Sequence, residues 1–210
     1  MRNYHETRFT FDKSRLKVWK ALTDYFQHFV GKDKCVLDLG CGYGDFINLI
    51  NASKKFAIDL NPEMANYLRP EVKFNHQSVL LPFEGIENMS LDVVFASNLF
   101  EHFDDAELNV LIDNIKRVLK PGGKLMLMQP NIYYVYREYW DDYTHKKAFS
   151  HSSLCDFLLS QNFSIERVEG KFIPFSLKSR LPKSYWLTKM YLALPFRFFA
   201  KQMFVVAKKA

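Results

Sequence analysis

The chain has 210 residues, of which 48% are hydrophobic and 16% aromatic, with only eight Gly and eight Pro. This composition excludes wholesale disorder and a fibrous structure, and the length predicts one compact domain. The formal charge is +6, but residues 171–210 hold nine Lys or Arg and no acidic residue, which leaves residues 1–170 at −3. The basic end therefore predicts a surface that meets an anionic partner.

The cysteines and the apolar runs indicate where the protein resides. Cys35, Cys41 and Cys155 are odd in number and form no C-x-x-C pair, which predicts neither a disulfide framework nor a zinc site. The N-terminus lacks an apolar signal core, and apolar residues nowhere run on for the roughly 18 positions that a spanning helix needs. We therefore expect a cytoplasmic protein without a cleaved signal or a transmembrane helix.

Helical and strand patterns alternate along the chain. Apolar residues three and four positions apart predict a leading helix over 14–30, inside an N-terminal helical segment 1–33. Further helices are predicted over 45–52, 62–68, 104–119, 150–161 and 183–194. Short apolar runs predict strands over 35–40, 55–60, 72–77, 91–97, 124–130, 164–175 and 202–209. This alternation predicts an open, Rossmann-like α/β sheet with helices on both faces.

A glycine-rich loop, DLGCGYGD over 38–45, follows the first predicted strand. Ligands of such sheets bind at the carboxyl ends of the strands, where glycines let the backbone come close to them. Asp59 ends the second predicted strand and is placed to accept hydrogen bonds from two ribose hydroxyls, which indicates a nucleoside-bearing cofactor. NAD is the first alternative, but the loop lacks the G-x-G-x-x-G spacing, and Asp45 would repel a pyrophosphate.

Four motifs in order carry a family resemblance: VLDLGCGYGDF, AIDLNPEM, LDVVFASNLFEHF and LKPGGKLMLMQP. Together they resemble the successive motifs of class I S-adenosylmethionine-dependent methyltransferases. The resemblance implies a seven-stranded, mostly parallel sheet with an antiparallel last strand, and S-adenosylmethionine as cofactor. It also divides the single domain into a cofactor-binding core, 34–130, and an acceptor-side region, 131–210, with a basic aromatic insertion at about 176–200.

The resemblance implies roles for ten cofactor-binding residues: Asp38, Gly40, Cys41, Gly42, Asp59, Leu60, Gln77, Ser78, Ser97 and Asn98. Asp38 and the glycines would hold the methionine part, Asp59 the ribose, and Leu60 and Gln77 the adenine. Ser97 and Asn98 would lie beside the carboxypropyl arm or the sulfonium. Residues 75–78 read Asn-His-Gln-Ser, which departs from the many relatives that have an acid there for the adenine amino group.

Methyl transfer to an alcohol requires alignment and a base. A neutral His accepts a proton near pH 7, and a neighbouring carboxylate orients it. We expect His145, oriented by Asp141 or Asp142, to be the base, with His102 as the second candidate. We predict no metal-binding residue for this reaction. In one alternative, Asp141 and Asp142 hold a divalent cation. In another, they form a solvated acidic loop.

The acceptor is predicted from two loops. Ser97-Asn98-Leu99-Phe100 lacks the Pro-Pro-aromatic pattern of enzymes that methylate base amino groups, which disfavours a DNA adenine. The segment YWDDYTHKKAFS over 139–150 resembles methyltransferases of bacterial surface-glycan and lipid-linked sugar pathways, which implies O-methylation of a sugar or glycan in polysaccharide biosynthesis. An RNA or another small molecule as acceptor, and a cofactor-binding protein without turnover, remain alternatives.

The predicted helix over 183–194 has an apolar face formed by Trp186, Leu187, Met190, Tyr191 and Leu194. One interpretation is a lid or interfacial helix at the inner face of a membrane, with Lys183, Lys189, Arg197 and Lys201 facing anionic lipid or a diphosphate. The other is packing of that face against the sheet or a second subunit. Nucleic acid is the less favoured partner, because no recognisable binding module accompanies the basic surface.

Overall fold

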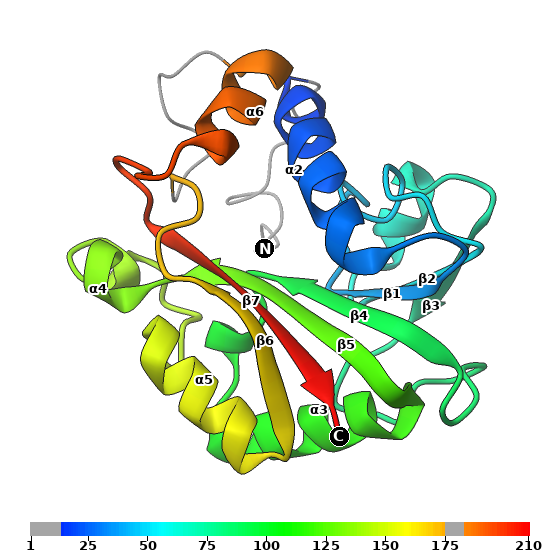
Figure 1. The fold of residues 1–210 in the computed structure, drawn as a ribbon. Helices are drawn as coiled ribbons and strands as arrows, with labels where there is room; N and C mark the ends of the chain where they lie inside the picture. The colour runs from blue at the N-terminus through cyan, green and yellow to red at the C-terminus, as the bar shows by residue number, and fades with distance from the viewer. Residues whose placement is uncertain (1–13, 175–182) are drawn as a thin grey trace.

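One mixed sheet of seven strands lies at the centre of the computed structural model, which describes residues 14–174 and 183–210 (Figure 1). The strands are β1 (Cys35–Leu39), β2 (Lys54–Asp59), β3 (Val72–His76), β4 (Leu91–Ser97), β5 (Leu119–Pro130), β6 (Phe163–Glu169) and β7 (Gln202–Lys209). Their order in the sheet is β3-β2-β1-β4-β5-β7-β6. The first five strands pair in parallel, whereas β7 runs antiparallel to both β5 and β6. The predicted sheet, with its antiparallel last strand, is confirmed.

Helices cover both faces of this sheet, as predicted (Figure 1). The α-helices are α2 (Arg15–Val30), α3 (Asp105–Val118), α4 (Ile132–Val135), α5 (His151–Ser160) and α6 (Tyr185–Ala193). Short 3-10 helices are η1 (Pro62–Tyr67), η2 (Phe100–His102) and η3 (Tyr139–Asp141). Within the described residues, no helix has both the length and the apolar character that crossing a membrane requires.

Each face of the sheet has its own apolar core, because successive side chains of a strand point to opposite faces. Val36 and Phe204 belong to the core under α2 and α6, whereas the neighbouring Leu37 and Val205 belong to the core under α3 and α5. Burying both faces accounts for the nearly continuous apolar sequence of β1, β4 and β7. The sheet is therefore rigid where its strand ends form the site.

The helix boundaries follow local capping. The Asp104 carboxylate accepts from the N–H of Glu107, whose own carboxylate accepts from the N–H of Asp104, and this capping box starts α3. Ser150 and Ser153 form the same arrangement at the start of α5. The helices predicted over 104–119 and 150–161 are thus confirmed to within one residue at each end.

The helix predicted over 45–52 is wrong, because this segment is a series of turns. Asn48 and Ile50 donate to carbonyls four residues back, but Leu49 donates to Phe46, three residues back, so the hydrogen bonds do not propagate as a regular helix. The side chain of Asn48 is also committed elsewhere: it donates to the carbonyl of Tyr67 and accepts from the N–H of Arg69. The segment is therefore fixed against the end of η1 instead of continuing as a helix.

Three other predicted elements are corrected. The helix expected over 62–68 is the 3-10 helix η1, although Asn61 caps it as its spacing indicates. The fifth strand starts at Leu119, five residues early, and takes up the Pro-Gly-Gly turn. The strand expected over 164–175 ends at Glu169, because residues 170–173 leave β6 and hydrogen-bond to the start of β7. Residues 1–13 of the N-terminal segment and 175–182 of the insertion lie outside the described residues.

Candidate functional site

A cavity of about 390 Å³ opens at the carboxyl ends of β1, β2, β3 and β4, a volume typical of small-molecule sites. The ten residues predicted to bind the cofactor all contribute to its wall, together with His102. They converge because parallel strands end at one edge of the sheet. Asp142 and His145, the other predicted catalytic residues, are not among its lining residues.

The glycine loop and the end of β2 are joined by Asp59. Its two carboxylate oxygens accept from the N–H of Gly42 at 2.8 Å and from the N–H of Asn61 at 2.9 Å. A carboxylate oxygen has more than one acceptor position, so both oxygens retain capacity for hydroxyl groups of a ligand. Gly42 has φ of +49°, and a Cβ there would meet no atom within 4 Å, so its missing side chain leaves the space beside Asp59 open.

Asp38 lies at the floor of the cavity, almost fully buried at the end of β1. Burial raises the pKa of its carboxyl well above its usual range, the nearby Asp59 raises it further, and the N–H of Ile47, which donates to it, lowers it. A cationic ligand group bound beside Asp38 would relieve this cost by favouring the ionised carboxylate. The floor of the cavity therefore suits an ammonium group.

Helix α2 closes another side of the cavity with two buried donors that sequence reasoning missed. The Nε of Arg15 and the indole N–H of Trp19 have no hydrogen-bond partner in the described part of the chain. Both residues line the cavity, and Arg15 is held there by an ion pair of 2.7 Å with Asp45. Buried donors of this kind fit a carboxylate. With Asp38, they match the two charged ends of an amino-acid moiety.

The end of β4 is shaped by Asn98, which has φ of +50°. Its side-chain oxygen accepts from Gln202 Nε2 at 2.9 Å, so the first residue of β7 fixes the orientation of this amide. Its N–H donates to the carbonyl of Met128 on β5. Left-handed Asn is an uncommon but tolerated conformation, and here it turns the chain sharply at the cavity wall.

Gln77 and Ser78 line the cavity mainly through a self-supporting loop. Gln77 donates from Nε2 to the carbonyl of Pro82 at 3.1 Å and accepts from the N–H of Glu84 at 3.0 Å. Ser78 accepts from the N–H of Leu80. Leu60 lies at the mouth and is 70% exposed, which leaves an apolar side chain available to a flat ring.

His102 connects the cavity to the loop after β5. The hydroxyl of Thr144 donates to Asp142 Oδ1 at 2.6 Å, and its oxygen lies 3.0 Å from His102 Nδ1. Because that hydroxyl gives its proton to Asp142, its oxygen accepts from Nδ1–H, and the Nε2 of His102 then carries the lone pair. Burial, and next the adjacent His145, lower the pKa of His102, which favours the neutral ring.

His145 lies beside His102, with the ring centres 5.0 Å apart. Its Nδ1 is 2.7 Å from the carbonyl of Tyr139, which fixes the ring outside the cavity lining. The structure therefore brings the three predicted catalytic residues together, and a relay runs from Asp142 through Thr144 to His102.

Glu101 lies under the two histidines and is 1% exposed. Neither of its carboxylate oxygens has a hydrogen-bond partner among the described residues, and burial raises its pKa to about 8. Its donor atoms and those of His102 and His145 lie within 4.8 Å of one another, so these three residues are the described group that could hold a metal ion. Asp142, predicted in the alternative to bind a cation with Asp141, accepts hydrogen bonds at Oδ1 from the N–H and the hydroxyl of Thr144.

Comparison with known proteins identifies the family. The sequence model of a family described as a methyltransferase domain matches residues 11–168, about three quarters of the chain. The chain belongs to this family, so its Rossmann-like fold and cavity are those of a class I methyltransferase domain, and S-adenosylmethionine is its cofactor. The Asp38 floor, the buried donors of Arg15 and Trp19 and the remaining acceptor capacity of Asp59 are compatible with that cofactor.

Individual proteins are similar to this chain in fold or over part of its sequence. A S-adenosylmethionine-dependent methyltransferase from Archaeoglobus fulgidus superposes with a TM-score of 0.69 over 99% of this chain and 100% of its own, at 22% identity. Phosphoethanolamine N-methyltransferase 1 of Triticum aestivum is 31% identical over 105 residues, 46% of this chain and 21% of that protein. An uncharacterized protein of Methanocaldococcus jannaschii is 31% identical over 101 residues, 48% of this chain and 42% of its own. The chain thus spans less than half the length of either curated relative.

Proposed function

We propose that this protein transfers a methyl group from S-adenosylmethionine to a hydroxyl of a sugar or lipid-linked glycan, with His102 as the general base. S-adenosylmethionine supplies the methyl group on a sulfonium, which is a good leaving group. The chain's own residues align the acceptor and receive its proton. The observation that carries the proposal is a neutral His on the cavity wall, with its Nδ1 held by Thr144.

The relay from Asp142 supports His102 over His145 as the base. Thr144 and Asp142 are positioning residues, since they hold the tautomer in which Nε2 of His102 accepts a proton. His145, the base that the sequence favours, is the alternative, and it shares a ring contact with His102. In the proposal it acts by lowering the pKa of His102.

The loop after β5 supports a sugar as acceptor. It carries four exposed aromatic side chains at the carboxyl edge of the sheet: Tyr133, Tyr136, Trp140 and Tyr143. A sugar ring presents apolar C–H faces together with hydroxyl edges, and an exposed ring with a polar group suits both. Phenol and indole groups of this kind also orient a neutral polyol without requiring a charge on it.

Transfer from isotopically labelled S-adenosylmethionine to nucleotide sugars, polyprenyl-linked glycans and tRNA tests the acceptor class. We expect a labelled ether on a sugar hydroxyl, and label on tRNA alone would contradict the proposal. His102→Ala should lower kcat by about 100-fold or more while the cofactor still binds, as measured by calorimetry. His145→Ala is the matched variant: loss of turnover there with full activity in His102→Ala would transfer the base to His145.

A further inference from the structure

We propose that the surface formed by α6 and the segment that follows it docks this protein onto an anionic lipid membrane. Seven large apolar side chains within fourteen residues are 46–85% exposed there. They are Trp186, Leu187, Met190, Leu194, Phe196, Phe198 and Phe199, and they are called the aromatic patch below. Single exposed apolar residues are ordinary, whereas a concentration of this kind marks an interaction surface.

The patch results from how α6 packs. Leu192 is the buried residue of the helix, and Tyr185 hydrogen-bonds from its hydroxyl to Asp24 of α2 at 2.8 Å. α6 therefore lies against α2 (Figure 1). Trp186 and Met190, four residues apart, share the opposite side of the helix and are exposed. The apolar face predicted from the sequence thus points outward, except for the half-buried Tyr191.

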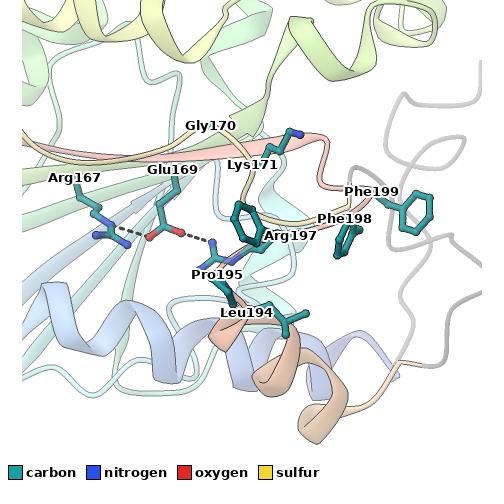
Figure 2. A pocket seen from close by; sticks show the side chains of 10 residues that line it. Arg167, Glu169, Gly170, Lys171, Leu194, Pro195, Arg197, Phe198 and Phe199 are labelled. Atoms are coloured by element: carbon teal, nitrogen blue, oxygen red, sulfur yellow. Dashed lines mark hydrogen bonds and ion pairs between the residues drawn. The ribbon is translucent and has the colours of Figure 1, made fainter.

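The segment after α6 is firmly anchored, so the exposure of its rings is built into the fold. The side chain of Arg197 is largely buried: it forms an ion pair with Glu169 (Figure 2) and donates a hydrogen bond to the carbonyl of Leu192. The guanidinium also lies 5.3 Å from the ring centre of Phe172. The hydroxyl of Tyr191 donates to the carbonyl of Phe198 at 2.8 Å. The backbone is held in place while Phe198 and Phe199 point away from Glu169 (Figure 2).

Phe199 gives a second, independent observation. Its φ is +60°, a left-handed conformation that is rare and unfavourable for a bulky side chain. Its ring is the most exposed of the patch, at 85%. A strained backbone that holds a phenyl ring in water stabilises neither the helix nor the core. Such strain is typical of segments whose conformation serves binding.

The charges around the patch favour anionic lipid as its partner. Lys183 precedes α6, Lys189 lies on it and Lys171 flanks the segment, whereas Lys201 is ion-paired with Glu138; residues 171–210 contain no Asp or Glu. Lys, Trp and long aliphatic side chains together are typical of interfacial helices, because the lysine stems reach past the apolar face to phosphate groups. A protein partner is less suited, since Lys is depleted in the cores of protein interfaces.

RNA is less suited than lipid for a reason seen at Arg197. Stacking surfaces for single strands combine aromatic rings with free guanidinium groups. Here Arg197 is committed to Glu169, and the patch includes Leu187, Met190 and Leu194, which offer no flat face. A cavity of about 540 Å³ also opens between Arg197 and the rings of Phe196 and Phe198; Lys171 lines it, and so does Glu169, whose charge is offset by ion pairs with Arg167 and Arg197. Such a groove suits a lipid with an anionic headgroup.

The position of the patch relates it to the active site. The segment after α6 leads directly into Gln202, whose side chain hydrogen-bonds to Asn98 in the cofactor cavity. Helix α2, against which α6 packs, contributes Arg15 and Trp19 to the same cavity. Docking through the patch would therefore hold the cavity near the membrane surface. This inference does not depend on which acceptor is methylated.

Flotation with vesicles tests the proposal on the full chain. One vesicle preparation contains phosphatidylglycerol and phosphatidylcholine in a ratio of about one to two, and the other phosphatidylcholine alone. We expect binding to the first that is about 100-fold stronger than to the second, and that weakens as salt is added. Equal binding to both preparations, or none to either, would overturn the proposal.

Two matched pairs of variants locate the binding surface. Trp186→Ser with Phe198→Ser and Phe199→Ser should weaken vesicle binding by about 100-fold or more, whereas Val110→Ser with Leu159→Ser, exposed on α3 and α5, should not change it. Lys183→Gln with Lys189→Gln should weaken it by about 30-fold, but Lys32→Gln with Lys54→Gln should have little effect. Calorimetric titration with S-adenosylmethionine shows whether each variant keeps its fold. An unchanged vesicle affinity in the patch variant, or a loss of poly(U) binding in place of lipid binding, would refute the assignment.

Discussion

Replacing Glu101 by Gln should stabilise the fold, and by an amount that grows with pH. Burial, with a smaller contribution from the charge of Asp142, raises the pKa of Glu101 from 4.5 to about 8. A group whose pKa is raised in the folded state contributes stability that is fully present below the unfolded pKa. That contribution is lost as the pH rises through the folded pKa. The window for this loss is therefore about pH 4.5 to 8.

The size of the effect follows from the same shift. Each pKa unit corresponds to about 1.4 kcal/mol, so the wild-type protein loses on the order of 3 kcal/mol by pH 7 and about 4 to 5 kcal/mol above pH 8. The amide of Glu101→Gln has the same shape and does not ionise. The free energy of unfolding of the variant minus that of the wild type should therefore increase by about 3 to 4 kcal/mol between pH 5 and pH 9.

Urea denaturation at pH 5, 7 and 9 measures this difference, and Asp92→Asn is the control. Burial alone would raise the pKa of Asp92, but the N–H of Cys35 and the ammonium groups of Lys120 and Lys34 outweigh burial and lower it. Its contribution is present above the unfolded pKa and lost only at acid pH, so Asp92→Asn should destabilise equally at all three values. A difference for Glu101→Gln that is flat or falls with pH would refute the reasoning.

Three further predictions concern the cofactor, the base and the C-terminal anchor. Asp59→Ala should weaken S-adenosylmethionine binding by about 10- to 100-fold in calorimetry, because a carboxylate acceptor is lost. The nearby Glu63→Ala should leave the affinity unchanged. Equal affinities of Asp59→Ala and the wild type would show that Asp59 does not bind the cofactor. Burial and His145 lower the pKa of His102, so kcat/KM should fall on the acid side of its pH profile only below pH 6.5. His145→Asn should move this acid limb to higher pH. An acid limb that does not move would contradict His102 as the base. Glu169→Ala leaves Arg197 buried without its carboxylate and should lower the free energy of unfolding by about 3 to 5 kcal/mol, against less than about 1 kcal/mol for Glu166→Ala on the same strand. Similar losses for the two variants would show that the Glu169 ion pair is not a buried anchor.

The sheet and the residues that line the cavity were predictable because they depend on local pattern. The apolar run of β1 ends in Asp38 and the glycine loop, and Asp59 ends β2, so strand order alone brings these residues to one edge. The residues predicted from the family motifs line the cavity in the structure. The helix predicted over 45–52 does not form, because the side chain of Asn48 hydrogen-bonds to residues about twenty positions away. A local sequence pattern carries no information on such contacts.

The parts of the site that sequence reasoning missed depend on contacts between distant segments. Arg15 reaches Asp45 across thirty positions, and Thr144 joins Asp142 to His102 across forty-two. The sequence places Asp142 next to His145 in the chain, but the loop turns His145 to the carbonyl of Tyr139 and Thr144 to the cavity. The sequence left the orientation of α6 open for a related reason, because an apolar stripe does not show which side of a helix its neighbour covers.

The position of β7 in the sheet has a consequence for how the chain is made. β7 follows the other six strands in sequence, yet it lies between β5 and β6, and its Gln202 hydrogen-bonds to Asn98 of the cavity wall. On a ribosome, β5 and β6 emerge well before the strand that joins them, so their facing edges wait without a partner. Until residues 202–209 are synthesised, the emerging chain therefore exposes two strand edges with unpaired backbone N–H and C=O groups. A stalled or truncated product would be prone to aggregate through these edges.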